Sequence, residues 1–155
     1  MKEAQQLMDL LLKRHMTFGS AESCTGGNIA HEMTMLAGVS EVYLGSVVSY
    51  SNEVKTGVLH VKKQTLASYG AVSEQTAREM AEGARKVLGV DCAVATSGIA
   101  GPGGAVPGKP VGTVCMAFST PEATVSHTFH FPGSRAEVIT AATATALAKM
   151  AKMLA

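Results

Sequence analysis

The chain has 155 residues, which is enough for a sizeable core, and we expect one domain over residues 1–155. A formal net charge of +1 and the absence of tryptophan argue against a nucleic-acid-binding surface. No apolar run approaches the roughly 18 residues of a membrane span, and the N-terminal segment does not resemble a signal peptide. We therefore expect a cytoplasmic protein without membrane contact. Only 16% of the residues are charged, which favours surface hidden in a homo-oligomer, a dimer or higher.

Cysteines and histidines give no sign of a metal site. Cys24, Cys92 and Cys115 are widely spaced and form no Cys-x-x-Cys pair, so neither a disulfide framework nor a zinc site is expected. The five histidines form no ligand pattern, and no cluster of carboxylates accompanies them. We predict no metal and no cofactor.

The first half of the chain alternates helical and strand patterns. The predicted segments are a helix over 3–15, a strand over 16–21, a helix over 28–36, a strand over 42–50 and short helices over 51–59 and 62–68. Ser51 or Asn52 is expected to cap the first short helix, and Gly70 to end the second.

The second half contains the clearest helix and two buried strands. In order, the predicted segments are a helix from Ser73 to a stop at Gly89, a strand over 91–97, a loop over 98–110, strands over 111–120 and 124–131, and a last helix opened by a capping box at Ser134. The strand over 124–131 suits an antiparallel neighbour. Alternating strands and helices followed by a strand pair predict an α/β protein, a three-layer α/β/α sandwich with a mixed, mostly parallel sheet.

Residues 21–27, AESCTGG, lie between a predicted strand and a helix, where an open α/β sheet places its ligand sites. Free amides there can bind an anion or stabilise an oxyanion; the alternative, which spacing alone favours, is that Ser23 or Thr25 only caps the helix. Cys24 is a tempting nucleophile, yet a lone cysteine is usually a small buried hydrophobe, and it would need a base. Ser23 also needs a base, and a lysine that is largely neutral near pH 7 would serve.

Three further segments contain candidate functional groups. Tyr50 and Lys55 follow a strand and open a helix, so a phenol and an amine can reach the same end of the sheet, or form an ordinary capped helix. The glycine-rich loop after Ser97 does not spell a dinucleotide fingerprint, but its backbone can form the wall of a pocket. Arg135 lies in the first turn of the last helix, where the dipole disfavours a cation unless an anion is bound beside it.

Six segments occur in one order: AESCTGG, YSNEVK, AVSEQTAREMAEGA, TSGIAGPGG, KPVGTV and FPGSR. Together they resemble the CinA C-terminal domain family, the nicotinamide-nucleotide amidases (PncC), over about residues 4–153. The resemblance implies hydrolysis of the carboxamide of nicotinamide mononucleotide (NMN) to nicotinic acid mononucleotide and ammonia, in pyridine-nucleotide recycling and without a metal. The long CinA proteins also carry a nucleotide-pyrophosphatase domain, which these 155 residues do not include.

The resemblance also implies roles for individual residues. Ser23 is the nucleophile, Lys55 the neutral base, and Tyr50 a residue that orients Lys55 or relays its proton. The substrate-binding residues implied are Thr25, Gly26, Gly27, Ser97, Gly98 and Arg135. Amides of the turn over 25–27 would hold the oxyanion, and Arg135, with amides near Ser134, the nucleotide phosphate. Thr96 is the alternative to Ser97.

Two alternatives remain at this stage. The chain could be a non-catalytic nucleotide-binding or competence-associated module that uses the same pocket. It could also be an amidase that depends on Cys24 rather than Ser23. Release of ammonia from NMN separates the first alternative from an amidase, and alkylation of thiols tests the second.

Overall fold

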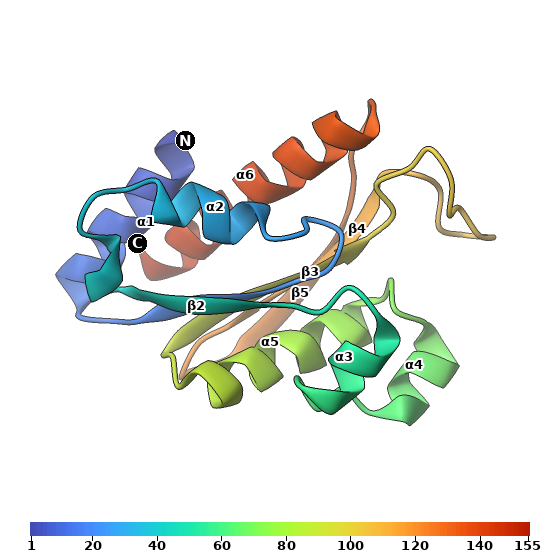
Figure 1. Ribbon diagram of the computed structural model, residues 1–155, viewed down its shortest axis with the longest axis horizontal. Coiled ribbons are helices and arrows are strands. Elements are labelled where there is room, and N and C mark those ends of the chain that lie inside the picture. Colours follow the sequence, from blue (N-terminus) through green and yellow to red (C-terminus); the bar gives the residue numbers. More distant parts are fainter.

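The computed structural model describes residues 1–155 and shows a five-stranded sheet between two layers of helices (Figure 1). The strands are β1 Phe18–Glu22, β2 Tyr43–Val48, β3 Cys92–Gly98, β4 Thr113–Ser119 and β5 Thr124–His130. Their order in the sheet is β2-β1-β3-β4-β5. β1 pairs in parallel with β2 and β3, whereas β4 is antiparallel to both β3 and β5. The predicted three-layer sandwich with a mixed, mostly parallel sheet is confirmed, because β4 alone runs against the other strands.

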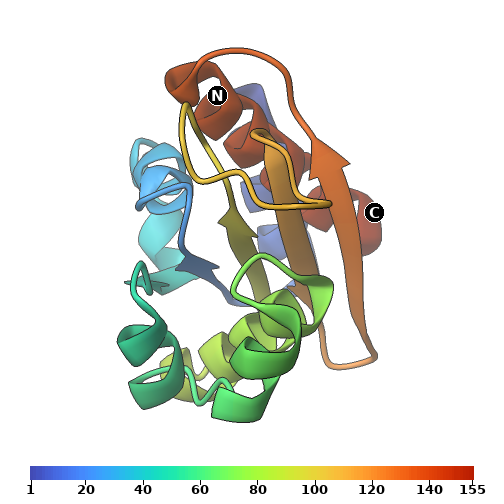
Figure 2. The same cartoon turned by 90° about the vertical axis from the view of Figure 1, so that its right-hand side faces the viewer.

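Six α-helices and one short 3₁₀ helix surround the sheet. They are α1 Lys2–Arg14, α2 Asn28–Thr34, η1 Val39–Glu41, α3 Asn52–Gly57, α4 Lys63–Tyr69, α5 Glu74–Leu88 and α6 Arg135–Leu154. Helices α1, α2 and α6 cover one face, and α3, α4 and α5 lie on the other (Figures 1 and 2). None of these helices is both long and apolar enough to cross a membrane.

Capping groups define the helix ends as predicted. The Ser73 side chain accepts a hydrogen bond from the amide of Thr76 at the start of α5, and Gly89 ends that helix in the left-handed conformation. Ser134 and Glu137 form the predicted capping box of α6. Of the two caps considered for α3, Ser51 is the one that accepts the hydrogen bond.

The first strand starts two residues later than predicted. The amide of Met16 bonds the carbonyl of Leu11, so Met16 closes the end of α1. The amide of Thr17 donates to the Asp91 carboxylate over 2.8 Å. Regular strand pairing therefore begins only at Phe18. The 3₁₀ helix η1 was not predicted.

The two faces of the sheet carry two separate hydrophobic cores, since side chains alternate along each strand. Cys92 and Val94 of β3 face a larger core shared with α1, α2 and α6. Ala93 and Ala95 face a smaller core packed against α5. Many residues of this second core are alanines, which permits α5 to approach the sheet closely.

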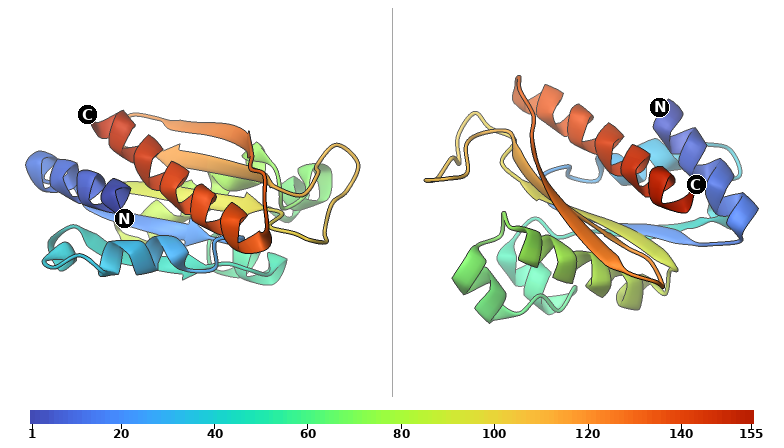
Figure 3. Two further views of the ribbon diagram at one scale, coloured as in Figure 1. Left: turned by 90° about the horizontal axis from the view of Figure 1, so that it is seen from above. Right: turned by 180° about the vertical axis from the view of Figure 1, so that it is seen from behind.

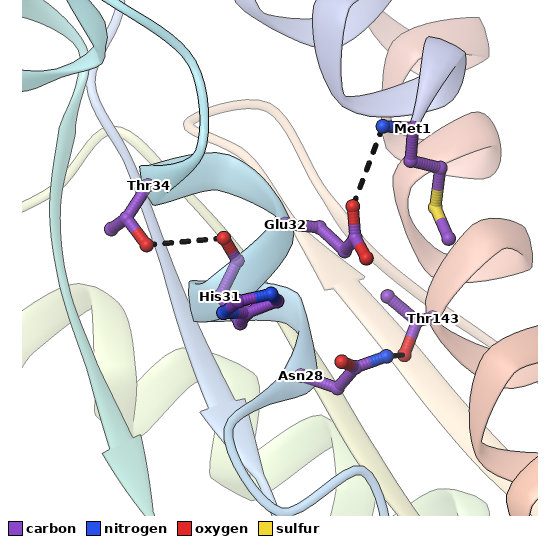
Figure 4. A network of polar contacts seen from close by, with 6 residues as sticks. All are labelled: Met1, Asn28, His31, Glu32, Thr34 and Thr143. Carbon is purple, nitrogen blue, oxygen red and sulfur yellow. Dashed lines mark hydrogen bonds and ion pairs between the residues drawn. The ribbon is translucent and has the colours of Figure 1, made fainter.

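Polar contacts fix α2 to its neighbours (Figure 4). The side-chain amide of Asn28, the first residue of α2, donates to the hydroxyl of Thr143 on α6 over 2.8 Å. The amino group of Met1 lies 3.4 Å from the Glu32 carboxylate. These contacts position a helix that begins directly after AESCTGG.

The loop after β3 extends beyond the end of the sheet (Figure 3). Gly112, at its end, has a φ of 92°, and a Cβ there would collide with the carbonyl of Phe131. The loop is therefore held against the segment that precedes α6, and its glycine-rich part stays close to the carboxyl ends of β1 and β3.

Candidate active site

Ser23 and Lys55 form the centre of the site. Ser23 directly follows β1, so strand alternation directs Glu22 toward α2 and Ser23 toward α3. The Nζ of Lys55, on α3, lies 3.1 Å from the Oγ of Ser23. Ser23 is 8% exposed and Lys55 only 1%. A serine and a lysine distant in sequence thus meet in a buried setting at the carboxyl end of the parallel strands.

The surroundings of Lys55 favour a neutral amine. Its Nζ also donates to the carbonyl of Ser49 over 2.7 Å and to that of Tyr50 over 3.3 Å. The only ion pair in the structure joins Met1 and Glu32, so no carboxylate pairs with Lys55. Burial lowers the pKa of Lys55 below its ordinary value of 10.5. A neutral amine that donates to two carbonyls keeps one lone pair for the hydroxyl of Ser23.

A cavity of about 310 Å³ opens onto this pair. Its walls come from the turn after β1, the segment before α3, α3 itself, the α4–α5 connection, the end of β3, the loop after β3 and the first residue of α6. The lining residues are Ser23, Cys24, Tyr50, Asn52, Lys55, Ala71, Val72, Ser97, Gly98, Ile99, Ala100, Gly101, Gly103, Gly104 and Arg135. Six of the nine residues proposed from the sequence lie here: Ser23, Tyr50, Lys55, Ser97, Gly98 and Arg135.

Sequence reasoning missed several cavity residues. Asn52 begins α3 within the YSNEVK segment, so its position beside Tyr50 could have marked it. Ala71 and Val72 carry no comparable signal, because only tertiary packing brings the α4–α5 connection to the site. The hydroxyl of Ser97 donates to the carbonyl of Ala71 over 2.7 Å and fixes this connection against β3.

The phenol of Tyr50 forms a hydrogen bond with Arg135 and not with Lys55. Its hydroxyl accepts a hydrogen bond from Nη2 of Arg135 over 3.1 Å, while Nη1 donates to the carbonyl of Gly101 over 2.8 Å. Tyr50 touches Lys55 through its backbone carbonyl. The expectation that its phenol orients Lys55 or relays the proton is therefore corrected: the phenol, 61% exposed, helps to hold Arg135 at the cavity mouth.

The turn over residues 25–27 does not line the cavity, contrary to expectation. The hydroxyl of Thr25 and the amide of Gly27 both donate to the Glu22 carboxylate, over 2.8 and 3.1 Å. The amide of Gly26 donates to the carbonyl of Ser23. These groups are thus already committed and do not provide the oxyanion donors. The amide of Cys24 donates to no other residue, and Cys24 lines the cavity, whereas Thr25 does not.

Thr96 and Ser97 face opposite sides of β3. The hydroxyl of Thr96 contacts Thr25 at 2.8 Å, beneath α2, whereas Ser97 lines the cavity. Of the two hydroxyls weighed from the sequence, Ser97 is therefore the one within reach of a bound molecule. Gly98 lies where a Cβ would meet the carbonyl of Thr113, so glycine is needed for the close approach of β3 and β4.

Cys24 is only 6% exposed, although it borders the cavity. Burial raises the pKa of its thiol to about 12, despite a hydrogen bond with Thr96 that acts in the opposite direction. A thiol with such a pKa stays protonated near neutral pH and is a poor nucleophile. The geometry favours Ser23 over Cys24.

The amide of Ser134 is not free to bind an anion, which corrects a third expectation. It donates to Oε1 of Glu137 over 2.9 Å, and this hydrogen bond lowers the pKa of that carboxyl. The Arg135 guanidinium therefore remains the candidate anion-binding group at this end of α6. No group of three or more His, Cys, Asp or Glu side chains is arranged to hold a metal ion.

The fold and the site define a three-layer α/β/α protein with a buried serine–lysine pair where β1 ends. The family described as "CinA C-terminal domain" matches residues 1–154, so the chain belongs to this family. A CinA-like protein from Leptospira borgpetersenii is 48% identical over 132 residues, which cover 84% of this chain and 32% of that protein. The chain thus spans about a third of the length of this relative.

Solved structures agree with the family assignment. A CinA superfamily protein from Klebsiella pneumoniae superposes with a TM-score of 0.96 at 35% identity, covering 99% of this chain and 96% of that one. A competence/damage inducible protein from Agrobacterium tumefaciens gives a TM-score of 0.94 at 38% identity, covering 99% and 93%. The fold is therefore shared across nearly the whole length of these structures.

Proposed function

We propose that the chain is a nicotinamide-nucleotide amidase, which hydrolyses the carboxamide of NMN to nicotinic acid mononucleotide and ammonia. The observation that carries this proposal is the 3.1 Å contact between Ser23 and a buried Lys55 whose pKa is lowered. Amide hydrolysis needs an activated nucleophile and an acid for the departing amine, and one such pair supplies both.

The first half of the reaction forms an ester on Ser23. Its Oγ attacks the carboxamide carbon while the neutral amine of Lys55 accepts the hydroxyl proton. The tetrahedral intermediate collapses when the resulting ammonium returns this proton to the departing nitrogen. Ammonia leaves, and the nicotinoyl group stays bound to Ser23.

The second half restores the protein. Water attacks the ester carbon, Lys55 accepts a proton from that water, and the same proton then returns to the Oγ of Ser23. Nicotinic acid mononucleotide is released. The amide of Cys24 directly follows the nucleophile, belongs to a residue that lines the cavity and donates to no other residue, so it is the candidate donor to the oxyanion.

Arg135 gives the proposed site its selectivity for a nucleotide. Its guanidinium lies at the cavity mouth, held by Gly101 and Tyr50, where it can bind the 5′-phosphate through charge-assisted hydrogen bonds. Binding energy from this remote group positions the carboxamide against Ser23. The apolar side chains of Val72 and Ile99 line the same cavity.

The decisive experiment measures ammonia released from NMN by the wild type, Ser23→Ala and Cys24→Ala. Wild type and Cys24→Ala should release ammonia, and Ser23→Ala should not, while all three bind NMN in calorimetry. Binding without ammonia release by the wild type would instead identify a non-catalytic nucleotide-binding module. Loss of turnover in Cys24→Ala alone would favour the thiol.

A further inference from the structure

Glu22, the residue before the nucleophile, is a buried carboxylate with no cationic partner. It ends β1, is 0% exposed and takes part in no ion pair. An unpaired charge removed from water is costly unless hydrogen bonds satisfy it. Six groups lie within hydrogen-bond distance, and all six can donate: the hydroxyls of Ser20, Thr25 and Ser46 and the amides of Gly27, Ile29 and Ala30.

The two oxygens of this carboxylate bind different parts of the fold. Oε1 accepts from Thr25 at 2.8 Å, Gly27 at 3.1 Å and Ile29 at 2.9 Å, all in the turn or the first turn of α2. Oε2 accepts from Ser20 on β1 and Ser46 on β2, both at 3.1 Å, and from Ala30 at 3.0 Å. One side chain thus ties the turn that bears Ser23 to two strands and a helix.

The backbone of Glu22 extends the same link to Lys55. Its carbonyl accepts from the amide of Ser49 over 2.8 Å, and the carbonyl of Ser49 accepts from Nζ of Lys55 over 2.7 Å. On the other side, the amide of Ser23 donates to Thr96 over 3.0 Å. The peptide that precedes the nucleophile is therefore held from both neighbouring strands.

From this arrangement we propose that Glu22 is a positioning residue, whose carboxylate holds the turn over 23–27 so that Ser23 faces Lys55 and the amide of Cys24 stays beside the cavity. This inference rests on the proposed function. Glu22 does not line the cavity and acts only through the turn. Burial is the main cause of the raised pKa of the Cys24 thiol, and the charge of Glu22 adds a smaller increase.

A carboxylate is required because it accepts hydrogen bonds and never donates when ionised. In Glu22→Gln the NH₂ group replaces one oxygen, and each oxygen accepts from at least one backbone N–H. In either orientation, the NH₂ group of the glutamine therefore points at a backbone N–H, and two donors face each other without an acceptor. Thr25→Val has nearly the same shape, keeps the carboxylate and removes one of the three donors to Oε1.

The test compares Glu22→Gln and Thr25→Val with the wild type and with Asp91→Asn. Asp91 accepts from the amide and hydroxyl of Thr17 at the opposite end of the sheet, so its variant loses a similar contact away from the cavity. Thermal unfolding, kcat and KM for NMN, and the rate at which a fluorophosphonate probe labels Ser23 are measured well below each unfolding temperature.

Glu22→Gln and Thr25→Val should lower kcat by about tenfold to a hundredfold, the effect expected from a nucleophile misplaced by about 1 Å. KM should stay within about twofold, because Arg135 is untouched, and labelling of Ser23 should fall with kcat. Asp91→Asn should lose stability and keep both rates. If Glu22→Gln does not fold, Thr25→Val carries the same comparison.

Wild-type kcat and labelling in folded Glu22→Gln or Thr25→Val would overturn the inference, as would a rise in KM at unchanged kcat. Labelling of Ser23 by the fluorophosphonate probe distinguishes a failure of the positioning role from a failure of the proposed function. A wild type that reacts at Ser23 but does not deamidate NMN refutes the substrate, and the variants still decide the role of Glu22. A wild type whose Ser23 is not labelled refutes the positioning role itself.

Discussion

At the scale of single residues, the chemistry depends on the protonation of Lys55. Its Nζ is buried against two carbonyls and one hydroxyl, and no carboxylate stabilises the ammonium form. The lowered pKa makes the amine available as a base at lower pH than for a lysine in water.

Turnover should therefore follow the neutral fraction of Lys55. Lysine can act as a base only in its neutral form, which predominates when the pH exceeds its pKa. The value of kcat/KM should therefore rise with pH through a pKa below 10.5 and then level off. Lys55→Arg should be nearly inactive at every pH, because a guanidinium stays protonated. A pH–rate profile of both proteins checks this, and normal turnover by Lys55→Arg would refute the role of Lys55 as base.

The same residue should lower stability at neutral pH. Between the lowered pKa of the folded state and 10.5, the unfolded chain binds one more proton, so wild-type stability increases with pH by up to about 1.4 kcal/mol per pH unit. Lys55→Met has similar volume and no titrating group. Its stability relative to wild type should therefore be greatest at low pH and decline up to pH 10.5.

Urea unfolding of wild type and Lys55→Met across this pH range measures the difference. The prediction concerns how the stability difference between the two proteins changes with pH. The hydrogen bonds to Ser49 and Tyr50 that methionine loses change this difference by the same amount at every pH and do not alter its slope. Parallel stability curves would show that Lys55 titrates alike in the folded and unfolded states.

Sequence patterns identified the serine and the lysine but not the orientation of every side chain. Thr25 and Gly27 looked available because the sequence shows a turn, and it does not show that a buried Glu22 uses their donors. The phenol of Tyr50 could be assigned to the correct end of the sheet. Its contact with Arg135 joins residues 85 positions apart, which no local pattern encodes.

At the scale of elements, the segment that follows α3 makes a close contact with α5. Gly83 of α5 lies where a Cβ would collide with the carbonyl of Leu59, just after α3. Helix α3 bears Lys55, so this approach helps to position the helix whose base contacts Ser23. Glycine is therefore required in the middle of a helix that would otherwise favour alanine.

Gly83→Ala should destabilise the protein by about 1–3 kcal/mol, the usual cost of an overpacked contact, and reduce kcat by displacing α3. Gly57→Ala, within α3 itself, is the matched control, since nothing lies within 4 Å of its Cβ. That variant should gain about 0.4–1 kcal/mol. Chemical unfolding and NMN kinetics of both test this, and equal stability of the two variants would contradict it.

Element prediction succeeded where a local group sets the boundary. Ser73 and Ser134 mark helix starts through their own side chains, and the structure uses both caps. Strand ends were less predictable because they depend on segments distant in sequence: Thr17, just before β1, donates to Asp91, 74 residues away, instead of extending the strand. The family resemblance added the site residues, which periodicity alone leaves ambiguous.

At the scale of the whole molecule, the cavity is assembled from both ends of the chain. Ser23 follows the first strand, and Arg135 begins the last helix, with the loop after β3 between them. The guanidinium contacts Tyr50 and Gly101, so it joins three segments that are distant in sequence. A ligand that bridges Ser23 and Arg135 must therefore present its amide and its anion at opposite ends.

This arrangement predicts a substrate-dependent effect of Arg135→Ala. Losing a charge-assisted contact costs about 1.5–3 kcal/mol, so KM for NMN should rise by roughly tenfold to a hundredfold. Nicotinamide riboside lacks the phosphate, should be a poor substrate for the wild type and should lose little in the variant. Arg78→Ala, an arginine on α5 that contacts Ser126, is the matched control and should leave both substrates unchanged. The measurement is kcat/KM for both substrates in all three proteins. An equal decrease of kcat/KM for NMN and for its riboside in Arg135→Ala would show that this guanidinium supports the cavity wall through Gly101 and Tyr50 and does not bind the phosphate.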